Sequence, residues 1–484
     1  MVVGTSSGAG KSLTVAGLAR IFYKDGFSTV PFKSQNMALN SFITSEGHEM
    51  GRAQVVQAIA CGLEPKSFMN PILLKPTGER KSQVILNGKS IGNMAWFDYS
   101  AFKSTLKGEI MALYEKNIRS QFEICIMEGA GSPVEINLVD DDIVNMGMAE
   151  MAGAPVVLVA DIDRGGVFAS VLGTVMLLPE NERKMLKGII INKFRGDIEV
   201  LRPGLEKLEK LTGIPVIGVL PYAELDIEDE DGLSARFQKR DKEGAIKVSI
   251  IKNMRISNFN DFDPFNIYGD VSVNYITHPS QMGDEDLIII PGSKNTIEDL
   301  KDLHEKGIIT EIIKSSRKGT PIIGICGGLQ MLGDRIKDPY QIESALPELP
   351  GIGLLNVETI MEKEKNTKQY SGKLENMRGF FQNLEGIEIE GYEIHQGITV
   401  TPEGKSVTSI SQGNIFATYV HGIFDNKEFI DRVLNNLREK KGMDQIQGSV
   451  SFSQYREREL DKLETLLREN IMMDKLYEIM EIER

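Results

Sequence analysis

The stretch Gly4–Ser12, which reads Gly-Thr-Ser-Ser-Gly-Ala-Gly-Lys-Ser, follows a short apolar run and precedes a helical pattern. Glycines in such a turn let backbone N–H groups point at phosphate oxygens, and the helix adds the positive end of its dipole. The first glycine stands one position earlier than in the common pattern, where this chain has Thr5, so the loop is a variant phosphate-binding loop. Lysine can reach the β- and γ-phosphates, and the serine can hold Mg²⁺. We therefore predict an ATP site formed by Gly8, Gly10, Lys11 and Ser12.

The composition limits the class of protein. A chain of 484 residues exceeds what one core usually supports, so we expect about two to three domains. No apolar run is long enough to span a bilayer and no signal peptide is recognisable, which favours a cytoplasmic protein without membrane contact. The formal net charge of −14 disfavours non-specific binding of nucleic acid, and the three widely spaced cysteines argue against a disulfide framework. Nothing in the composition excludes assembly of the chain into a homo-oligomer.

Short apolar runs alternate with helical patterns in both halves of the chain, which is typical of α/β domains with parallel sheets. Because the runs are apolar throughout, the strands should be buried on both faces, and ligands should bind beyond their carboxyl ends. The predicted strands are 124–127, 155–160, 188–191 and 216–220 in the first half, and 246–251, 271–276, 287–290 and 321–325 in the second. The section 34–108 is rich in Asn, Gln, Lys and Gly, and we expect elaborated loops there.

A change of composition marks the domain boundary. Residues 225–245 are strongly charged, so we predict a linker there, between an ATP-binding domain at 1–224 and a second α/β domain at 246–484. Near the C-terminus, apolar residues recur at helical spacing. We expect this segment to form a helix that packs on the second domain as its extension. The apolar positions are Leu460, Leu463, Leu467 and Ile471.

Polar side chains follow the predicted strands of the first domain. Glu128 ends the run 124–127 at the sheet edge expected to carry the phosphate loop, so we predict that it coordinates Mg²⁺. Asp161 ends the next run and could assist the metal or the substrate, while Arg164 could face a carboxylate or a phosphate. Asn192 ends a third run, where it could bind adenine or simply cap the strand.

A further candidate group follows an early apolar run. Lys33 stands next to the amides of Gln35 and Asn36. Lys33 could hold a phosphate or a substrate carboxylate, and a plain surface lysine is the alternative. We take these three residues, with Arg164, as candidate substrate-binding residues.

In the second domain, Cys326 stands in a Gly-x-Cys-x-Gly turn between a predicted buried strand and a helix. This is the thiol form of a nucleophile elbow, in which small neighbours permit a tight turn and the helix N-terminus favours the thiolate. His421 ends a strand-like run downstream and could act as the base, with His395 as its competitor. The backbone N–H groups of Gly292 and Gly327 could form an oxyanion hole.

A phosphate-loop domain and a Cys–His hydrolase domain in one chain suggest glutamine-dependent amidation. Cys326 would attack the carboxamide of glutamine and release ammonia. ATP would activate an acceptor carboxylate, which the ammonia then captures. Making ammonia next to the activated acid is useful, because ammonia in bulk water is mostly protonated and therefore not nucleophilic.

The sequence resembles the cobyric acid synthase family, the glutamine-hydrolysing amidases of cobalamin biosynthesis, over essentially its whole length. The segments that carry the resemblance are 4–12, 31–41, 70–76, 128–138, 161–170, 192–197, 255–264, 291–299, 324–333 and 419–426. The resemblance implies an N-terminal P-loop NTPase domain with the fold of dethiobiotin synthetase and a C-terminal class I glutamine amidotransferase domain. It also implies Cys326 as the nucleophile, His421 as the active-site histidine, ATP and Mg²⁺ as cofactors, and glutamine and an adenosylated corrinoid as partners.

The implied reaction is amidation of the peripheral carboxylates b, d, e and g of adenosylcobyrinic a,c-diamide, which gives adenosylcobyric acid. Cobyrinic acid a,c-diamide synthase, or another P-loop amidoligase, is the nearest alternative; segments 128–138 and 255–264 favour the first assignment. A nucleotide-switch protein with an inactive glutaminase domain is a further alternative. The presence of Cys326 and His421 argues against it. Class I enzymes usually carry a glutamate where this chain has Ile423, so a third triad member should come from elsewhere, with Asp425 as a candidate.

Overall fold

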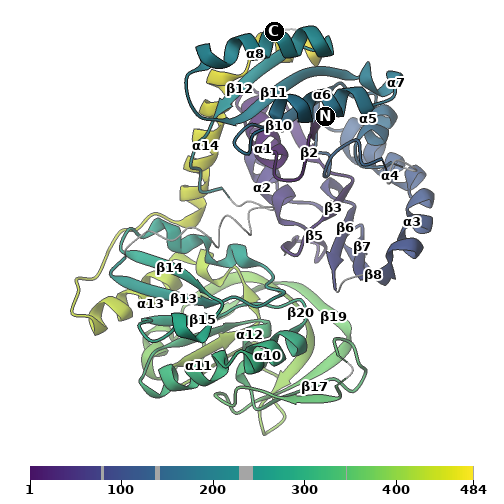
Figure 1. Ribbon diagram of the computed structural model, residues 1–484. Helices are drawn as coiled ribbons and strands as arrows, with labels where there is room; N and C mark the ends of the chain where they lie inside the picture. The colour runs from purple at the N-terminus through teal and green to yellow at the C-terminus, as the bar shows by residue number, and fades with distance from the viewer. Residues whose placement is uncertain (78–80, 137–141, 228–243, 345, 483–484) are drawn as a thin grey trace. The chain divides into compact units, whose positions relative to one another are not determined.

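The computed structural model describes residues 1–77, 81–136, 142–227, 244–344 and 346–482. Its contacts divide the chain into two compact units, which Figure 1 shows in colours that follow the chain. Unit 1 comprises Met1–Ala38, Glu49–Gly232 and Arg456–Arg484, and unit 2 comprises Leu39–His48 and Leu233–Tyr455. Most of the predicted linker, residues 228–243, lies outside the described residues. The units differ from the predicted domains because each contains a segment from the other half of the sequence.

The core of unit 1 is a parallel sheet with the strand order β1-β10-β11-β12. An isolated parallel bridge between Val2 and Glu128 joins this sheet to the parallel pair β2-β9. The predicted parallel arrangement is confirmed, with small differences at the strand ends. The strands are β1 (Val2–Gly4), β2 (Thr29–Phe32), β9 (Ile124–Met127), β10 (Val156–Asp161), β11 (Leu186–Phe194) and β12 (Val216–Pro221).

Helices cover both faces of this sheet, which explains why its strands are apolar throughout. Along β10, Val157 and Val159 pack into one hydrophobic cluster, and Val156, Leu158 and Ala160 pack into another on the opposite face. The first face is covered by α1 (Lys11–Lys24), α14 (Phe452–Asn470) and α15 (Met473–Ile479). The opposite face is covered by α5 (Met146–Ala152), α6 (Val167–Leu177) and α8 (Ile198–Thr212), with the short α7 (Glu180–Arg183) between α6 and β11.

The C-terminal helices differ from the expectation, because from Arg456 onward they belong to unit 1 and not to the second domain. Leu463 and Leu467 of α14 are 2% and 1% exposed and contact α1 so closely that a Cβ on Gly17 would lie 2.6 Å from Leu467 Cδ2. The buried guanidinium of Arg20 pairs with Glu457 at 2.6 Å and with Asp461 at 2.8 Å. The helical spacing therefore predicted the helix correctly but could not show which core it packs against.

The section 34–108, expected as elaborated loops, contains regular structure instead. Its sheet has the order β3-β6-β7-β8, with β6, β7 and β8 antiparallel. Many of its amide side chains are buried and hydrogen-bonded, so their polarity does not mark loops. The elements are β3 (Gln35–Met37), β5 (Glu49–Gly51), α2 (Arg52–Ala60), η1 (Ser67–Met69), β6 (Ile72–Pro76), β7 (Lys81–Leu86), β8 (Lys89–Ala95) and α3 (Trp96–Thr105); α4 (Lys107–Tyr114) and η2 (Glu115–Arg119) follow.

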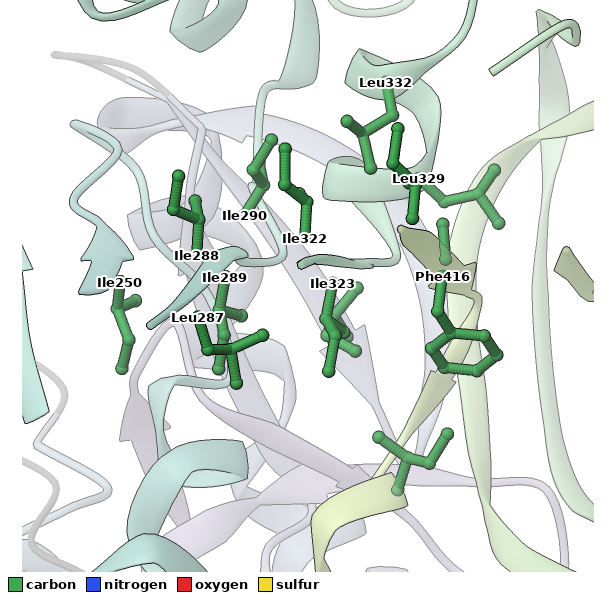
Figure 2. Close-up of a cluster of buried hydrophobic side chains, with 14 of the residues drawn as sticks. Ile250, Leu287, Ile288, Ile289, Ile290, Ile322, Ile323, Leu329, Leu332 and Phe416 are labelled. Atoms are coloured by element: carbon green, nitrogen blue, oxygen red, sulfur yellow. The ribbon is translucent and has the colours of Figure 1, made fainter. Parts of the chain in front are cut away.

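Unit 2 is built on a sheet with the order β14-β13-β15-β16-β22-β21, parallel except for β21. Figure 2 shows its core, where isoleucines of β13, β15 and β16 lie with Phe416 of β22 and with Leu329 and Leu332 of α12. The four strands predicted in this half are confirmed. The strands are β13 (Ile246–Ile251), β14 (Val271–Ile276), β15 (Leu287–Ile290), β16 (Ile322–Ile325), β21 (Ser409–Gln412) and β22 (Ile415–Thr418).

A second sheet of unit 2 has the order β18-β17-β19-β20-β23, in which β19 and β20 form a long antiparallel pair. Its strands are β17 (Arg335–Lys337), β18 (Glu348–Pro350), β19 (Glu358–Lys373), β20 (Glu388–Val400) and β23 (Val420–His421). The helices of unit 2 are η3 (Phe259–Ile267), η4 (Pro279–Gln281), α10 (Thr296–Glu305), α11 (Ile308–Arg317), α12 (Gly327–Leu332), η5 (Gly379–Leu384), η6 (Ile423–Asp425) and α13 (Lys427–Lys440).

The segment Leu39–His48 joins unit 2 through β4 (Ser41–Ile43). The hydroxyl of Tyr392 on β20 donates a hydrogen bond to the carbonyl of Ser41 at 3.1 Å, and the ring of Phe42 packs edge-on against the Tyr392 ring. These contacts explain why ten residues from the first half of the sequence cluster with the second unit. Across the described part of the chain, none of the helices combines the length and the apolar character that crossing a membrane requires.

Candidate functional site

The phosphate loop of unit 1 lies between β1 and α1. Gly8 and Gly10 have φ angles of 72° and 102°, a left-handed conformation that glycine adopts without strain. A Cβ on Gly10 would lie 2.0 Å from Nδ2 of Asn192, so a larger residue would displace the Asn192 side chain. The buried ammonium of Lys11 donates hydrogen bonds to the carbonyls of Ser6 and Gly131, each at 3.0 Å. The lysine is thus held across the loop where a phosphate chain would bind.

Glu128, at the end of β9, is only 1% exposed and is surrounded by donors. Its carboxylate accepts hydrogen bonds from Ser12 Oγ at 2.8 Å, Lys33 Nζ at 2.8 Å and Gln57 Nε2 at 2.6 Å. Burial alone would raise the pKa of Glu128, but the charge of Lys33 and these hydrogen bonds outweigh burial and hold the pKa below its ordinary value. Glu128 is therefore an anion beside the serine of the loop.

Helix α2 supplies two amides to this site that the sequence did not identify. Gln54 and Gln57 are fully buried, and the Gln54 side chain accepts a hydrogen bond from Asn36 Nδ2 at 3.0 Å. In a helix where the intervening residues are apolar, two glutamines three positions apart lie on one face. That spacing was the signal that sequence reasoning missed.

The same group of residues fits a Mg²⁺ ion. The hydroxyl of Ser12 and the carboxylate of Glu128 are oxygen ligands of the kind Mg²⁺ takes together with phosphate oxygens and water. The buried Oε1 of Gln57 has no hydrogen-bond partner among the described residues, which leaves a further oxygen at this point. The described residues contain no cluster of three or more His, Cys, Asp or Glu suited to a metal, so an ion here would depend on the nucleotide for most of its ligands.

Asn192 and Asp161 lie beside the loop but are already engaged. Asn192 Nδ2 donates to the carbonyl of Ala9 at 2.9 Å, which braces the loop. Asp161 pairs with Lys193 at 2.8 Å, and Lys193 also donates to the carbonyl of Gly8 at 2.9 Å. Lys193, another residue the sequence did not single out, has a φ of 61°, a backbone conformation that non-glycine residues seldom adopt.

A cavity of about 600 Å³ opens beside the loop. Lys11, Lys33, Gln35, Asn36 and Glu128 are all among its lining residues, so the structure brings these predicted residues together. Arg164 differs, because it is exposed in the turn after β10 and is not among the lining residues.

In unit 2, Cys326 occupies a sharp turn between β16 and α12, with φ 51° and ψ −103°. The turn depends on glycine at its neighbours, because a Cβ on Gly328 would lie 2.0 Å from the carbonyl oxygen of Ile290, and one on Gly327 would lie 3.0 Å from the backbone nitrogen of Ser293. The backbone N–H of Cys326 donates to the carbonyl of Thr418 at 2.7 Å. This strained strand–turn–helix geometry is that of a nucleophile elbow.

His421 lies next to Cys326 and is paired with a buried carboxylate. Its Nδ1 is 2.7 Å from Oδ2 of Asp261, and the other oxygen of Asp261 accepts a hydrogen bond from the backbone N–H of Gly422 at 3.1 Å. Burial lowers the pKa of His421, but the charge of Asp261 and the hydrogen bonds with Asp261 and Cys326 outweigh it and raise the pKa to about 10. The histidine is therefore protonated at neutral pH and oriented by Asp261.

Asp261, and not the sequence candidate Asp425, is the carboxylate that contacts His421. Asp261 belongs to η3, where it lies between buried phenylalanines. Two acidic residues among three phenylalanines in this short segment were a signal for buried carboxylates. Its distance in sequence from His421 concealed the pairing.

His395, the competing histidine, belongs to another network. Its Nδ1 is 2.9 Å from the carbonyl of Gly397, and its Nε2 is 3.2 Å from Glu393 and 3.1 Å from Asn366. Its ring stacks on Tyr419 at 3.7 Å. With both ring nitrogens engaged in this way, His395 is not placed to act on Cys326.

The two glycines predicted for an oxyanion hole lie close to this pair. Gly327 directly follows Cys326, and a Cβ on Gly292 would lie 3.2 Å from Cε1 of His421. The ring of His421 also stacks on Tyr392, with ring centres 5.5 Å apart. The structure thus brings Cys326, His421, Gly292 and Gly327 together at the carboxyl ends of β15 and β16.

Comparisons with known protein families match both units. Residues 1–233 match the CobQ/CobB/MinD/ParA nucleotide binding domain, and residues 247–429 match the CobB/CobQ-like glutamine amidotransferase domain. The predicted fold, a P-loop nucleotide-binding domain followed by a glutamine amidotransferase domain, is confirmed. Among solved structures, PurLQS from Thermotoga maritima is 20% identical, covers 40% of this chain and 99% of that chain, and has a TM-score of 0.31, too low to bear on the fold.

Curated relatives match nearly the whole chain. A cobyric acid synthase of Clostridium tetani is 51% identical over 99% of this chain and 98% of its own length. A cobyric acid synthase of Alkaliphilus metalliredigens is 51% identical over 99% of both chains. At this identity and coverage, and with both expected domains present, the chain belongs to the cobyric acid synthase family of glutamine-dependent, ATP-using amidoligases.

Proposed function

We propose that this chain amidates the carboxylates b, d, e and g of adenosylcobyrinic a,c-diamide to give adenosylcobyric acid. The observation that carries the proposal is the pairing of Cys326 with His421 in a chain that also holds Lys11, Ser12 and Glu128 at a phosphate loop. A glutaminase site alone would only waste glutamine, and an ATP site alone would have no source of ammonia. Family membership and the implied corrinoid support the choice of acceptor.

In the glutaminase half, the Cys326 thiolate attacks the carboxamide carbon of glutamine and forms a tetrahedral intermediate. The backbone N–H groups of Gly292 and Gly327 stabilise its oxyanion. The protonated His421, held by Asp261, gives its proton to the leaving nitrogen, and the C–N bond breaks to release ammonia and a glutamyl thioester. Water then attacks the thioester and gives a proton to the now neutral His421, glutamate leaves, and both the thiolate and the protonated histidine are restored.

In the synthetase half, a carboxylate of the corrinoid attacks the γ-phosphoryl group of ATP, which gives an acyl phosphate and ADP. Lys11 and the loop N–H groups hold the phosphates, and Lys33 faces the group being transferred. Bound through Ser12 and Glu128, Mg²⁺ would offset the charge on the phosphates. Ammonia then displaces phosphate from the acyl carbon, which leaves an amide and inorganic phosphate.

Asn192 would reach the nucleotide from beside the loop. Asp161 is the candidate for a further metal contact, and Arg164 is the candidate for a further substrate contact. The cytoplasmic location remains a prediction.

The test is mass spectrometry of the corrinoid after incubation with ATP, Mg²⁺ and either glutamine or ammonium. We expect stepwise conversion of four acids to amides. Cys326→Ala should fail with glutamine and work with ammonium, because it loses only the ammonia source, whereas Lys11→Ala should fail with both. If cobyrinic acid is amidated and its a,c-diamide is not, the chain is an a,c-diamide synthase. If neither ATP nor glutamine is consumed with any acceptor, the amidoligase proposal is wrong.

A further inference from the structure

The cavity beside the phosphate loop extends to a group of residues that the ATP chemistry does not use. Trp96, Lys103 and Lys107 line it, from helices α3 and α4. The spacings of seven and four residues place these side chains on one side of an almost continuous helical segment, which is interrupted only at Leu106. These three residues belong to neither the phosphate loop nor the strands that flank it.

This end of the cavity has an apolar surface open to solvent. Trp96, the only tryptophan in the chain, is 48% exposed, and Met37 on β3 is 54% exposed. Both line the cavity, together with Pro133 and Val144. A large exposed aromatic ring and an exposed methionine that line the same cavity are typical of a ligand surface and not of a core.

Helix α3 is fixed in place, so Trp96 is presented by a defined element. Tyr99, one turn after Trp96, is 4% exposed, and its hydroxyl donates a hydrogen bond to Oε1 of Gln35. Gln35 lies on β3, next to Lys33 and Met37. The strand that carries the candidate substrate residues and the helix that carries Trp96 are therefore joined directly.

The cavity wall carries side chains of both charges. Lys103 and Lys107 are half-buried near Trp96. Of the lining carboxylates, Asp142 accepts hydrogen bonds from the backbone N–H groups of Val144, Asn145 and Gly147. Burial and the charges of Asp142 and Glu150 raise the pKa of Glu182, so those three acids form one negative group. Lys103 and Lys107 bring positive charge to the same cavity.

We propose that Trp96, Met37, Lys103 and Lys107 form the acceptor subsite, which binds a flat macrocycle whose edge carries several carboxylates. This proposal rests on the proposed function and names the residues that would select its substrate. Trp96 and Met37 contact the apolar face of the ring, and the two lysines pair with peripheral carboxylates other than the one presented at Lys33. Each amidation removes one negative charge from the edge. The subsite therefore holds acids more tightly than amides, and the finished product dissociates.

The experiment measures binding of adenosylcobyrinic a,c-diamide and of its tetra-amidated product to the full chain by equilibrium dialysis, without ATP or glutamine. Trp96→Leu should weaken binding of both compounds about tenfold or more, because the aromatic contact is lost. The double variant Lys103→Ala/Lys107→Ala should weaken binding of the acid about threefold to tenfold and leave binding of the product almost unchanged. Added salt should reduce the wild-type preference for the acid.

Matched controls are Lys89→Ala and Lys116→Ala, exposed lysines of unit 1 that do not line the cavity. In the wild type, bound corrinoid should also shield the single tryptophan from acrylamide quenching. Thermal unfolding of all variants checks that unit 1 folds, because glutaminase activity would report only on unit 2. If the wild type binds and amidates the corrinoid but all variants bind both compounds as the wild type does, the subsite assignment is wrong and the proposed function stands. If the wild type does not bind the corrinoid at all, the proposed function fails and the subsite falls with it.

Discussion

His421 and Asp261 are separated by 160 residues in sequence, yet Nδ1 of the histidine lies 2.7 Å from a carboxylate oxygen of the aspartate. Both side chains are buried, and the second carboxylate oxygen is held by the backbone of Gly422. Asp261 is therefore the candidate for the role that a glutamate two residues after the histidine usually has in class I amidotransferases. We propose that Cys326, His421 and Asp261 form the catalytic triad, although the usual glutamate is missing at Ile423.

Replacing the carboxylate tests this relationship. Asp261→Asn should keep the shape of the site but remove the charge that orients and protonates His421. We expect the glutaminase kcat to fall about 10²- to 10⁴-fold. Amidation with added ammonium should be unchanged, because the synthetase half is not altered. Asp425→Asn, at the carboxylate suggested by sequence, is the control and should retain activity; a larger loss there than at Asp261 would contradict the assignment.

The pH profile of the glutaminase gives a second check on the same pair. Because Asp261 and Cys326 raise the pKa of His421 to about 10 against the counteracting effect of burial, the general acid should remain protonated across neutral pH. The basic limb of kcat/KM should therefore lie near pH 10 and move toward neutral pH in Asp261→Asn. By linkage, protonation of folded His421 stabilises the protein fully below about pH 6.5, and this stabilisation is lost as the pH rises toward 10. A basic limb that stays in place in the variant would show that Asp261 does not set this pKa.

The buried pair of Lys33 and Glu128 gives a prediction for the other site. Glu128→Gln should abolish amidation with either nitrogen source while leaving glutaminase activity intact. It should also destabilise unit 1 by up to about 3–5 kcal/mol, since it leaves the Lys33 ammonium buried without its counter-charge. Lys33→Met combined with Glu128→Gln should recover part of that loss in urea unfolding, because no unpaired charge remains. If the double variant is less stable than the sum of the two single changes predicts, the pair is not the source of the loss.

The elbow at Cys326 should tolerate no side chain at Gly328. Its Cβ would lie 2.0 Å from the Ile290 carbonyl, a backbone atom that cannot rotate away. We expect Gly328→Ala to destabilise unit 2 by about 1–3 kcal/mol or more and to abolish glutaminase activity. Gly269→Ala, in a turn of the same unit with no atom within 4 Å of its Cβ, is the control and should be close to neutral. Thermal unfolding measures the loss of stability. The rate of Cys326 alkylation measures whether the elbow still presents the thiol that glutaminase activity requires.

The parts that sequence predicted well depend on local patterns. Strands buried on both faces are uniformly apolar, and a phosphate loop or a thiol elbow is a short contiguous signal, so Lys11, Ser12 and Cys326 could be found by reading along the chain. Glu128 followed from the rule that site residues stand at strand ends. Each of these inferences needed only neighbours in sequence.

The parts that sequence missed depend on contacts between distant segments. Gln54 and Gln57 lie in a section whose amide content looked like loop, because hydrogen bonds to Asn36 and Glu128, which permit their burial, are not visible in sequence. Asp261 reaches His421 only through the fold of unit 2. An apolar helical stripe does not specify which of two cores will bury it.

The C-terminal helix allows that last point to be measured. Leu467 of α14 is 1% exposed and packs over Gly17 of α1, so Leu467→Ala should destabilise unit 1 by about 2–5 kcal/mol. Leu466→Ala, the same change at a half-buried neighbour, should cost clearly less. Because α14 from Arg456 onward belongs to unit 1, heating the Leu467 variant should abolish ammonium-dependent amidation at a lower temperature than in the wild type, while glutaminase activity keeps its wild-type profile. Loss of glutaminase activity first would place the helix with unit 2, as its position in the sequence suggested.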